Sequence, residues 1–246
     1  MSLSALKMDK DVEKATDNLG GGALDTNVYK LKVKTVYFGK SDGGAMSATL
    51  IGDLEDGSEF KSTQWITSGK AKGGKPYYER NGKKYPLPGY SIIDDLCQLT
   101  IGMSVGDAET EEKSVGIYDF ELQKDVATEV ECLADIKGME VYLAIQKQLV
   151  DKTAENPEFD DSKPANKDTN KLRLPTGETR EENEVIKVMS EDGATWKEIS
   201  DDAESQFGEK WLTKNKGKVR DRTDKSGAAG SAGAPKKSAK KKMFAN

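Results

Sequence analysis

The side chains best suited to a defined chemistry lie between residues 61 and 90. This stretch carries seven basic residues and one acid, Glu79, together with five of the chain's 17 aromatic residues. Cationic side chains contact phosphates, and flat rings stack on exposed bases at about 1–3 kcal/mol per base. The combination favours binding of single-stranded nucleic acid. The candidate contact residues are Lys61, Trp65, Lys70, Lys72, Lys75, Tyr77, Tyr78, Arg80, Lys83, Lys84 and Tyr85.

These residues divide into two roles. We assign phosphate contact to the lysines and base stacking to Trp65, Tyr78 and Tyr85. In the alternative interpretation, the tyrosines pack in the core and the lysines line a solvated loop. The first interpretation is favoured, because rings on a short hairpin have little else to pack against. Tyr77 is the residue that would replace Tyr78 if the strand register slipped by one position.

Other chemistries find little support. The chain has no histidine, which excludes histidine-based general base catalysis and imidazole metal ligands. Cys97 and Cys132 lie 35 positions apart, as expected of reduced core thiols rather than a zinc site. Residues 69–75 match the first seven positions of a phosphate-binding P-loop, but Pro76 stands where a Ser or Thr must hold magnesium. An ATPase is therefore not expected.

A metal-dependent nuclease is a remote alternative. Its carboxylates would be Asp53, Glu55 and Asp56, with the pair Asp94 and Asp95. The first group marks a turn, and the second lies near a helix N-terminus, where the helix dipole favours acids. We therefore expect a non-enzymatic protein that uses no metal and no cofactor.

Charge is segregated along the chain, which has a net charge of −5. Residues 214–246 hold eleven basic residues and two acids, whereas the chain outside 61–90 and 214–246 holds 20 basic and 40 acidic residues. Electrostatic fields in salt solution act over about a Debye length. The local charge of the two basic segments therefore decides what they attract more than the net charge of the whole chain does.

The C-terminal segment 214–246 is rich in Gly, Ala, Ser and Lys, which predicts a disordered basic tail. Three interpretations remain open for it: contact with phosphates, binding of a partner protein, or a solvated tail without a role. The candidate tail residues are Lys236, Lys237, Lys240, Lys241, Lys242 and Phe244.

Apolar runs are short throughout the chain. The longest is the five residues from Val141 to Ile145, so no bilayer-spanning helix and no membrane partner are expected. The N-terminus lacks the apolar stretch of a signal peptide, which predicts a cytoplasmic location.

The first element that must position these side chains is a strand at residues 28–38. Its alternating pattern predicts that Tyr29, Leu31, Val33 and Tyr37 share one face. Two further strands are predicted at residues 45–54 and 58–66, which makes a three-stranded antiparallel meander.

A tight hairpin is predicted over residues 77–85, because Asn81-Gly82 is a two-residue turn signal. This loop fixes the register, so that Glu79 and Lys84 pair on one side of the ribbon. The residues that project from the other side are Tyr78, Arg80, Lys83 and Tyr85.

The remaining elements define the predicted fold class. A short helix opens at Ser91 and closes near Gly102, and strand-like segments follow at 114–120, 129–134 and 139–150. This succession predicts a mainly β protein, a five-stranded Greek-key barrel of the OB type with an additional β-hairpin, a short helix between core strands and a C-terminal helix. The predicted parts are an arm at 1–27, an OB domain at 28–213 with an insertion loop at 151–182 and a helix at 196–213, and the tail at 214–246.

Several short motifs carry a resemblance. They are Ile66 to Lys72, Tyr77-Tyr78-Glu79 with Asn81 to Tyr85, Leu87 to Tyr90, and Pro175 to Arg180. Together they resemble the single-stranded DNA-binding proteins of tailed bacteriophages, particularly those of the N4-like podoviruses. The similarity covers roughly residues 24–215.

The resemblance implies an OB-fold core and sequence-independent binding of single-stranded DNA. It also implies service in phage replication and recombination, and in some such phages in transcription, within the host cell cytoplasm. Bacterial and T7-type relatives carry an acidic tail that recruits replication proteins, whereas the tail here is basic, so that partner scheme does not transfer. The main alternative function is an adaptor protein that acts through its basic tail on a polymerase-type partner.

Overall fold

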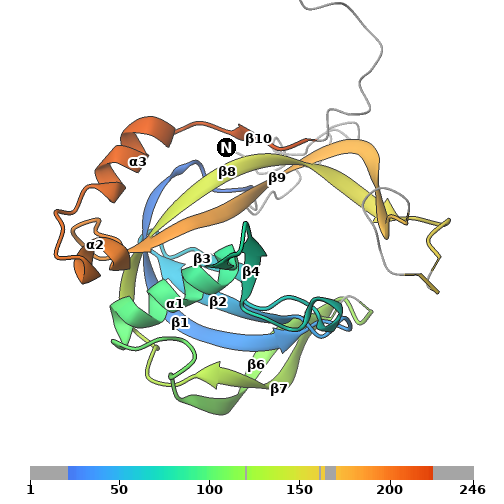
Figure 1. The fold of residues 1–246 in the computed structure, drawn as a ribbon, viewed down its shortest axis with the longest axis horizontal. Helices are drawn as coiled ribbons and strands as arrows, with labels where there is room; N and C mark the ends of the chain where they lie inside the picture. The colour runs from blue at the N-terminus through green and yellow to red at the C-terminus, as the bar shows by residue number, and fades with distance from the viewer. Residues whose placement is uncertain (1–21, 120, 161, 164–169, 224–246) are drawn as a thin grey trace, which may run out of the picture. The chain divides into compact units, whose positions relative to one another are not determined.

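The computed structural model of the protein describes residues 22–119, 121–160, 162–163 and 170–223. Figure 1 shows antiparallel strands and a few short helices, so the mainly β class is confirmed. The chain divides into unit 1, residues 1–148 and 181–220, and unit 2, residues 149–180 and 221–246. In the described residues, no helix has both the length and the apolar character needed to cross a membrane.

Three strands form the meander of unit 1. They are β1 (Asn27–Lys40), β2 (Met46–Leu54) and β3 (Glu59–Trp65), paired antiparallel in that order. Gly57 turns the chain between β2 and β3 with φ +80°, and the Asp56 carboxylate accepts a hydrogen bond from the Ser58 amide at 2.9 Å. The predicted meander is confirmed.

β1 contains a bulge that the alternating pattern did not reveal. Its register on β2 shifts between Val33 and Thr35, which places an extra residue in β1. Leu31 and Val33 face the main core before the bulge, and Val36 faces it afterwards. Tyr37 therefore packs on the opposite face of the sheet. The prediction that it shares the face of Leu31 is wrong, because one extra residue exchanges the two faces.

Helix α1 (Pro88–Thr100) covers one face of the meander (Figure 1). It begins three residues before the predicted Ser91, with Leu87 as N-cap and no capping side chain. Proline suits the first helical position because its missing N–H would have no partner there. Ile93 and Leu96 are fully buried in the main core. The helix therefore anchors the C-terminal end of the basic segment to the core of unit 1.

The other strands complete an open antiparallel sheet. They are β6 (Thr110–Asp119), β7 (Lys124–Leu133), β8 (Glu140–Glu155), β9 (Arg173–Met189) and β10 (Arg220–Asp221). The sheet runs β10-β8-β1-β2-β3, with β9 beside β8 and the β6–β7 hairpin attached to β1 through β7. Over the described ranges, no ladder joins β3 to β9, so the sheet does not close into a hydrogen-bonded barrel.

The segment predicted as one helix at 196–213 forms two, α2 (Trp196–Ser200) and α3 (Phe207–Asn215). The single helix is therefore wrong, because Asp202 adopts a left-handed φ of 52° that ends the first one. Thr195 and Glu198 form a capping box at the start of α2. The Glu198 carboxylate also accepts hydrogen bonds from the amides of Gln206 and Phe207 at 3.1 and 2.9 Å, so it caps both helices.

This double cap makes stability depend on pH. Partial burial raises the pKa of the Glu198 carboxyl, but the hydrogen bonds it accepts outweigh burial and lower that pKa below its usual value. The stabilisation is therefore complete above the unfolded-state pKa and is lost as pH falls through the lowered folded-state pKa. We expect Glu198→Gln to lower the free energy of unfolding by about 0.5–2 kcal/mol at pH 7 and by less in acid. Urea denaturation at both pH values measures the difference, and an equal loss at both would contradict it.

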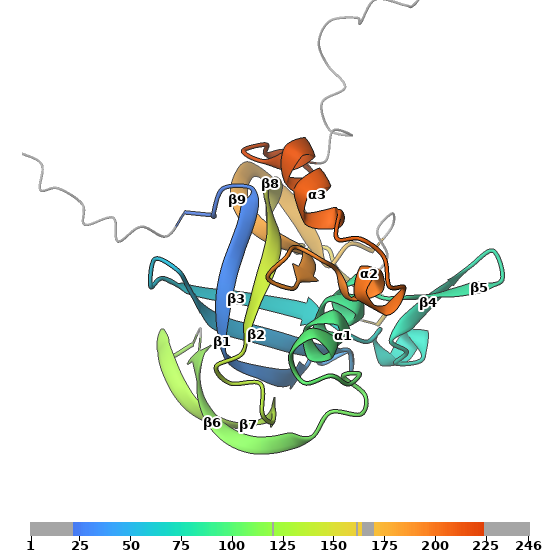
Figure 2. The same cartoon turned by 90° about the vertical axis from the view of Figure 1, so that its left-hand side faces the viewer.

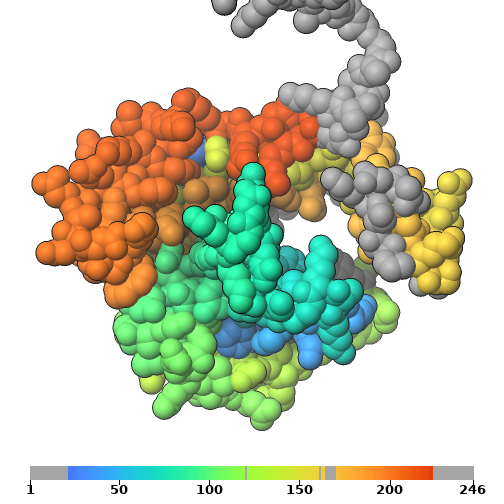
Figure 3. All heavy atoms as spheres, in the orientation of Figure 1, coloured from blue at the N-terminus to red at the C-terminus, as the bar shows by residue number. Residues whose placement is uncertain are grey.

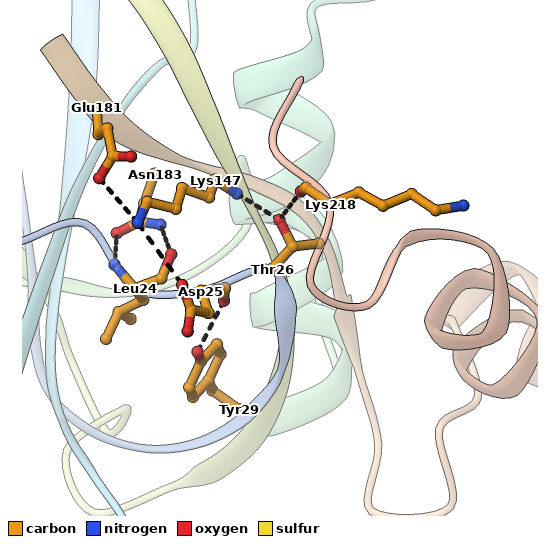
Figure 4. A network of polar contacts seen from close by, with 8 residues as sticks. All are labelled: Leu24, Asp25, Thr26, Tyr29, Lys147, Glu181, Asn183 and Lys218. Carbon is orange, nitrogen blue, oxygen red and sulfur yellow. Dashed lines mark hydrogen bonds and ion pairs between the residues drawn. The ribbon is translucent and has the colours of Figure 1, made fainter. Parts of the chain in front are cut away.

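Thr26 and Lys218, which lie near the first and last described residues of unit 1, are joined by a hydrogen bond (Figure 4). Thr26, which is buried, donates its hydroxyl proton to the Lys218 carbonyl, and the same oxygen accepts from the Lys147 amide at 2.9 Å. The Asn183 side chain exchanges two hydrogen bonds of 2.8 Å with the backbone of Leu24. The predicted arm and tail boundaries at 27 and 214 therefore need correction, because residues on both sides of these boundaries belong to the folded unit.

Unit 2 contains the outer ends of β8 and β9 and the turn between them. The two strands occupy much of the segment predicted as a loop at 151–182, so that prediction is wrong for its strand residues. Asn170 is buried in the turn, where its side chain bonds the backbone of Asp160 and Lys163. These strands could not be predicted from hydrophobic alternation, because this part of the ribbon is exposed on both faces and its sequence does not alternate.

Candidate nucleic-acid interface

A short hairpin projects from the body of unit 1 (Figure 2). It consists of β4 (Tyr77–Arg80) and β5 (Lys83–Pro86), which pair only with each other. Asn81 and Gly82 form its turn with φ values of 52° and 72°, the positive pair that a tight primed turn requires. The predicted hairpin and its register are confirmed.

One side of the hairpin presents two exposed rings. Tyr78 and Tyr85 are paired across the strands and stack, with ring centroids 5.6 Å apart and planes 26° apart. They remain 45% and 39% exposed, so stacking on each other does not bury them. Arg80 and Lys83 form the next cross-strand pair on the same side. This face therefore offers flat surfaces and cations together.

Tyr77 is placed differently from Tyr78. It is half-buried, and the ammonium groups of Lys75 and Lys84 lie 5.5 and 4.9 Å from its ring centroid. A ring already engaged by two cations is less free to stack than an exposed ring. The structure thus distinguishes the two neighbours that a one-residue slip would have exchanged, and it leaves Tyr78 as the open ring.

A compact loop connects β3 to the hairpin. It contains the single helical turn η2 (Lys70–Lys72), and the Lys70 amide bonds the Gly43 carbonyl at 2.8 Å. The Ser68 amide closes the loop on the Lys75 carbonyl, also at 2.8 Å. The segment leads into β4 rather than into a helix, so the context that a P-loop needs is lacking here.

These elements enclose a groove of about 870 Å³. Five of the predicted contact residues line it, namely Trp65, Lys72, Lys75, Tyr77 and Tyr78. The rest of the lining consists of Gly43, Thr63, Gln64, Thr67, Ser68, Gly69, Ala71, Glu79, Leu87, Pro88 and Gly89. Figure 3 shows the loop and hairpin, coloured teal to green, in front of the strands of unit 1.

Trp65 occupies the end of β3 and is 51% exposed. Its backbone is held by the start of α1, because a Cβ added at Gly89 would lie 2.4 Å from the Trp65 carbonyl oxygen. Only glycine allows an approach this close. The helix therefore fixes the strand end from which this large ring enters the groove.

The cations of residues 61–84 remain free of acidic partners. Within the part of the chain that the structure describes, none of the seven forms an ion pair. Two lysines of β1 differ, because Lys30 pairs with Glu140 at 2.8 Å and Lys34 with Asp53 at 2.7 Å. The positive charges of Lys30 and Lys34 are thus neutralised, whereas those around the groove are left available.

The other predicted residues lie outside the groove lining. Lys61 is on β3 with its ammonium 5.8 Å from the ring centroid of Tyr37, and Lys70 is exposed on the loop. The predicted residues on the exposed parts of the hairpin are Arg80, Lys83, Lys84 and Tyr85. The tail residues Lys236, Lys237, Lys240, Lys241, Lys242 and Phe244 lie outside the described residues.

Two of the lining residues that were not predicted as contacts lie on β3. Thr63 and Gln64 line the groove from β3, and their only signal was their position two and one residues before Trp65. Thr63 is exposed and shares the face of Trp65, because alternate residues of a strand point the same way.

Four of the five carboxylates considered for a metal, Asp53, Asp56, Asp94 and Asp95, have structural partners. Asp94 accepts hydrogen bonds from the Ser104 hydroxyl and the Val105 amide at 2.7 and 2.9 Å, and Asp95 pairs with Lys187 at 2.6 Å. No group of three or more candidate metal-ligating side chains occurs among the residues described. Cys97 and Cys132 are free and buried, as predicted, and burial raises the pKa of Cys97 to about 12.

The comparisons with known proteins give no relatives. No protein-family model matches the chain, and no curated protein or solved structure is significantly similar to it.

The free lysines of the groove lead to a test by salt. We expect Lys72→Ala with Lys75→Ala to reduce the slope of log affinity for oligo-dT against log salt by about 0.7 for each phosphate interaction removed. The matched control replaces Lys124 and Lys137, which are exposed and unpaired among the described residues and lie outside the groove. Equal slopes for both double variants would remove Lys72 and Lys75 from the interface.

Proposed function

We propose that this protein binds single-stranded DNA without sequence preference and coats it, without catalysing a reaction. One observation carries the proposal: the exposed aromatic residues Trp65 and Tyr78 line the same groove as Lys72 and Lys75, which form no ion pair in the described structure. Stacking rings and unpaired cations are the two components of sequence-independent single-strand recognition.

Electrostatics supports the same conclusion. Outside the two basic segments the chain carries 40 acids against 20 basic residues, so most of its surface repels a polyanion. Single-stranded DNA is therefore directed to the groove and is repelled by most of the remaining protein surface. Binding of a duplex is disfavoured because its bases are already stacked and paired. No base face is then exposed for Trp65 or Tyr78 to stack on.

The strand order supports an OB-type core. β3-β2-β1-β8-β9 is the order of the five strands of such a barrel opened between its third and fifth strands, and α1 lies between the third and fourth. β6 and β7 would then be an added hairpin. OB domains bind oligonucleotides on the face of their second and third strands and the neighbouring loops, and the groove here begins at β3.

The biological setting is part of the proposal. The motifs between Ile66 and Tyr90, together with Pro175 to Arg180, resemble those of phage single-stranded DNA-binding proteins, and the fold and groove are compatible with that resemblance. We propose that the protein acts in phage DNA replication and recombination, or in transcription, by holding DNA as a single strand inside the host cell.

The decisive measurement is a fluorescence titration with matched single- and double-stranded oligonucleotides. Trp65 is 51% exposed and lines the groove, so we expect oligo-dT to quench the protein's emission, and Trp65→Phe to lose most of that quenching while still binding. Trp196→Phe serves as the control, because Trp196 lies on α2, outside the groove lining.

Two results would contradict the proposed function. One is equal affinity for single strands and duplexes at matched salt, which would indicate a purely electrostatic interaction. The other is the absence of any saturable binding to oligo-dT. Preferential binding of single strands, with quenching carried by Trp65, would support it.

A further inference from the structure

A second, smaller pocket lies at the base of the same hairpin. It has a volume of about 230 Å³ and is lined by Pro76, Tyr77, Lys84, Pro86 and Tyr90. This volume is below the range of about 300–1,000 Å³ typical of small-molecule sites. Four of its five lining residues have rigid rings, so its shape suits one flat heterocycle rather than a large ligand.

The pocket adjoins the groove at one residue. Tyr77 lines both, and it pairs across the hairpin with Pro86. Neighbouring bases of one strand can therefore occupy the groove and the pocket on the two sides of Tyr77. The far wall is Tyr90, a half-buried residue of α1 that packs against the main core, so this wall belongs to the rigid body rather than to the hairpin.

Lys84 occupies the position that a stacked base would take. Its ammonium lies 4.9 Å from the Tyr77 ring centroid, and it forms no ion pair with the described acids. An exposed cation–π contact is weaker than the stacking of a base on an aromatic ring. A base can therefore displace Lys84 from the ring with a net gain, and the displaced ammonium remains close to the phosphate next to that base.

We propose that this pocket holds a nucleobase of the strand whose neighbouring bases lie in the groove, and that Lys84 moves from the Tyr77 ring to the adjacent phosphate on binding. The inference rests on the proposed function. It adds Tyr90 and Pro86 to the interface and gives Tyr77 a stacking role that is exercised only in the complex.

Photo-crosslinking tests the pocket directly. Oligo-dT carrying one 5-iododeoxyuridine is irradiated with the full-length protein, and the crosslinked residues are identified by mass spectrometry. We expect crosslinks at Tyr90, which lines the small pocket but not the groove, in addition to those at Trp65 or Tyr78. Crosslinks at Trp65 and Tyr78 without any at Tyr90, at every position of the label, would overturn the pocket and leave the proposed function intact.

Salt dependence tests the movement of Lys84. We expect Lys84→Met, which keeps an unbranched apolar stem, to reduce the slope of log affinity against log salt by about 0.7, the value for a single phosphate interaction. The control Lys124→Met should leave the slope unchanged. An unchanged slope for Lys84→Met would overturn the proposed movement. Failure of the wild-type protein to bind oligo-dT at all would instead refute the proposed function.

Discussion

Tyr78→Ala should weaken binding to oligo-dT by about 1–3 kcal/mol, which corresponds to about a 5- to 150-fold higher Kd. Tyr78 is 45% exposed, lines the groove, and stacks only on Tyr85 among the described residues. Removing it deletes one stacking surface and leaves the Tyr85 ring without its partner. Fluorescence titration at fixed salt gives the affinity, and circular dichroism establishes that the variant is folded.

The control for this variant is Tyr118→Ala. Tyr118 is also 45% exposed and also lies on a β-strand, but that strand is β6, outside the groove lining. A general effect of removing an exposed tyrosine would appear in both variants. If Tyr78→Ala binds oligo-dT as tightly as the wild type, Tyr78 does not belong to the site, and the stacking argument fails with it.

Gly89→Ala should destabilise unit 1 and disturb the groove at the same time. A Cβ at this position would lie 2.4 Å from the carbonyl oxygen and 2.9 Å from the amide nitrogen of Trp65. Both atoms belong to backbone, so neither can turn aside as a flexible side chain would. Overpacking of this kind costs about 1–3 kcal/mol, and it moves the end of β3 away from α1.

Urea denaturation gives the loss of stability, and Trp65 emission reports the displacement. The matched control is Gly106→Ala, because a Cβ there would meet no atom within 4 Å and the residue has no positive φ. A Gly89→Ala protein as stable as the control, with wild-type affinity for oligo-dT, would show that the contact between α1 and β3 does not position Trp65.

Local patterns explain why much of this architecture could be predicted. The hairpin at Tyr77–Pro86 follows from Asn81-Gly82, because a two-residue turn with positive φ values sets the register by itself. The capping box at Thr195 is equally local. In both cases the deciding interactions join residues only a few positions apart.

The errors arose where distant residues decide the outcome. The bulge in β1 is set by pairing with β2, and it moved Tyr37 to the opposite face. The helix predicted at 196–213 divides where Glu198 caps a second helix. Strand residues between 151 and 182 were missed because their ribbon has no buried face to impose alternation on the sequence.

The same distinction applies to the candidate site. Composition alone placed rings and cations together between residues 61 and 90, because clustering along the chain guarantees proximity in space. Lys30 and Lys34 of β1 look equally basic in sequence, yet the fold pairs both with acids and leaves Lys72 and Lys75 without an ion pair in the described structure. Only tertiary structure could separate the neutralised cations from the available ones.

The amino-acid sequence by itself determined the short-range features of this protein: the alternating strands, the primed hairpin turn and the segment in which cations and rings are concentrated. Tertiary structure decided which of these side chains share a groove, because its walls come from β3, the η2 loop, β4 and the first residues of α1. Their spacing depends on packing such as that of Gly89 against Trp65, and no local pattern encodes a contact between segments that far apart in the chain.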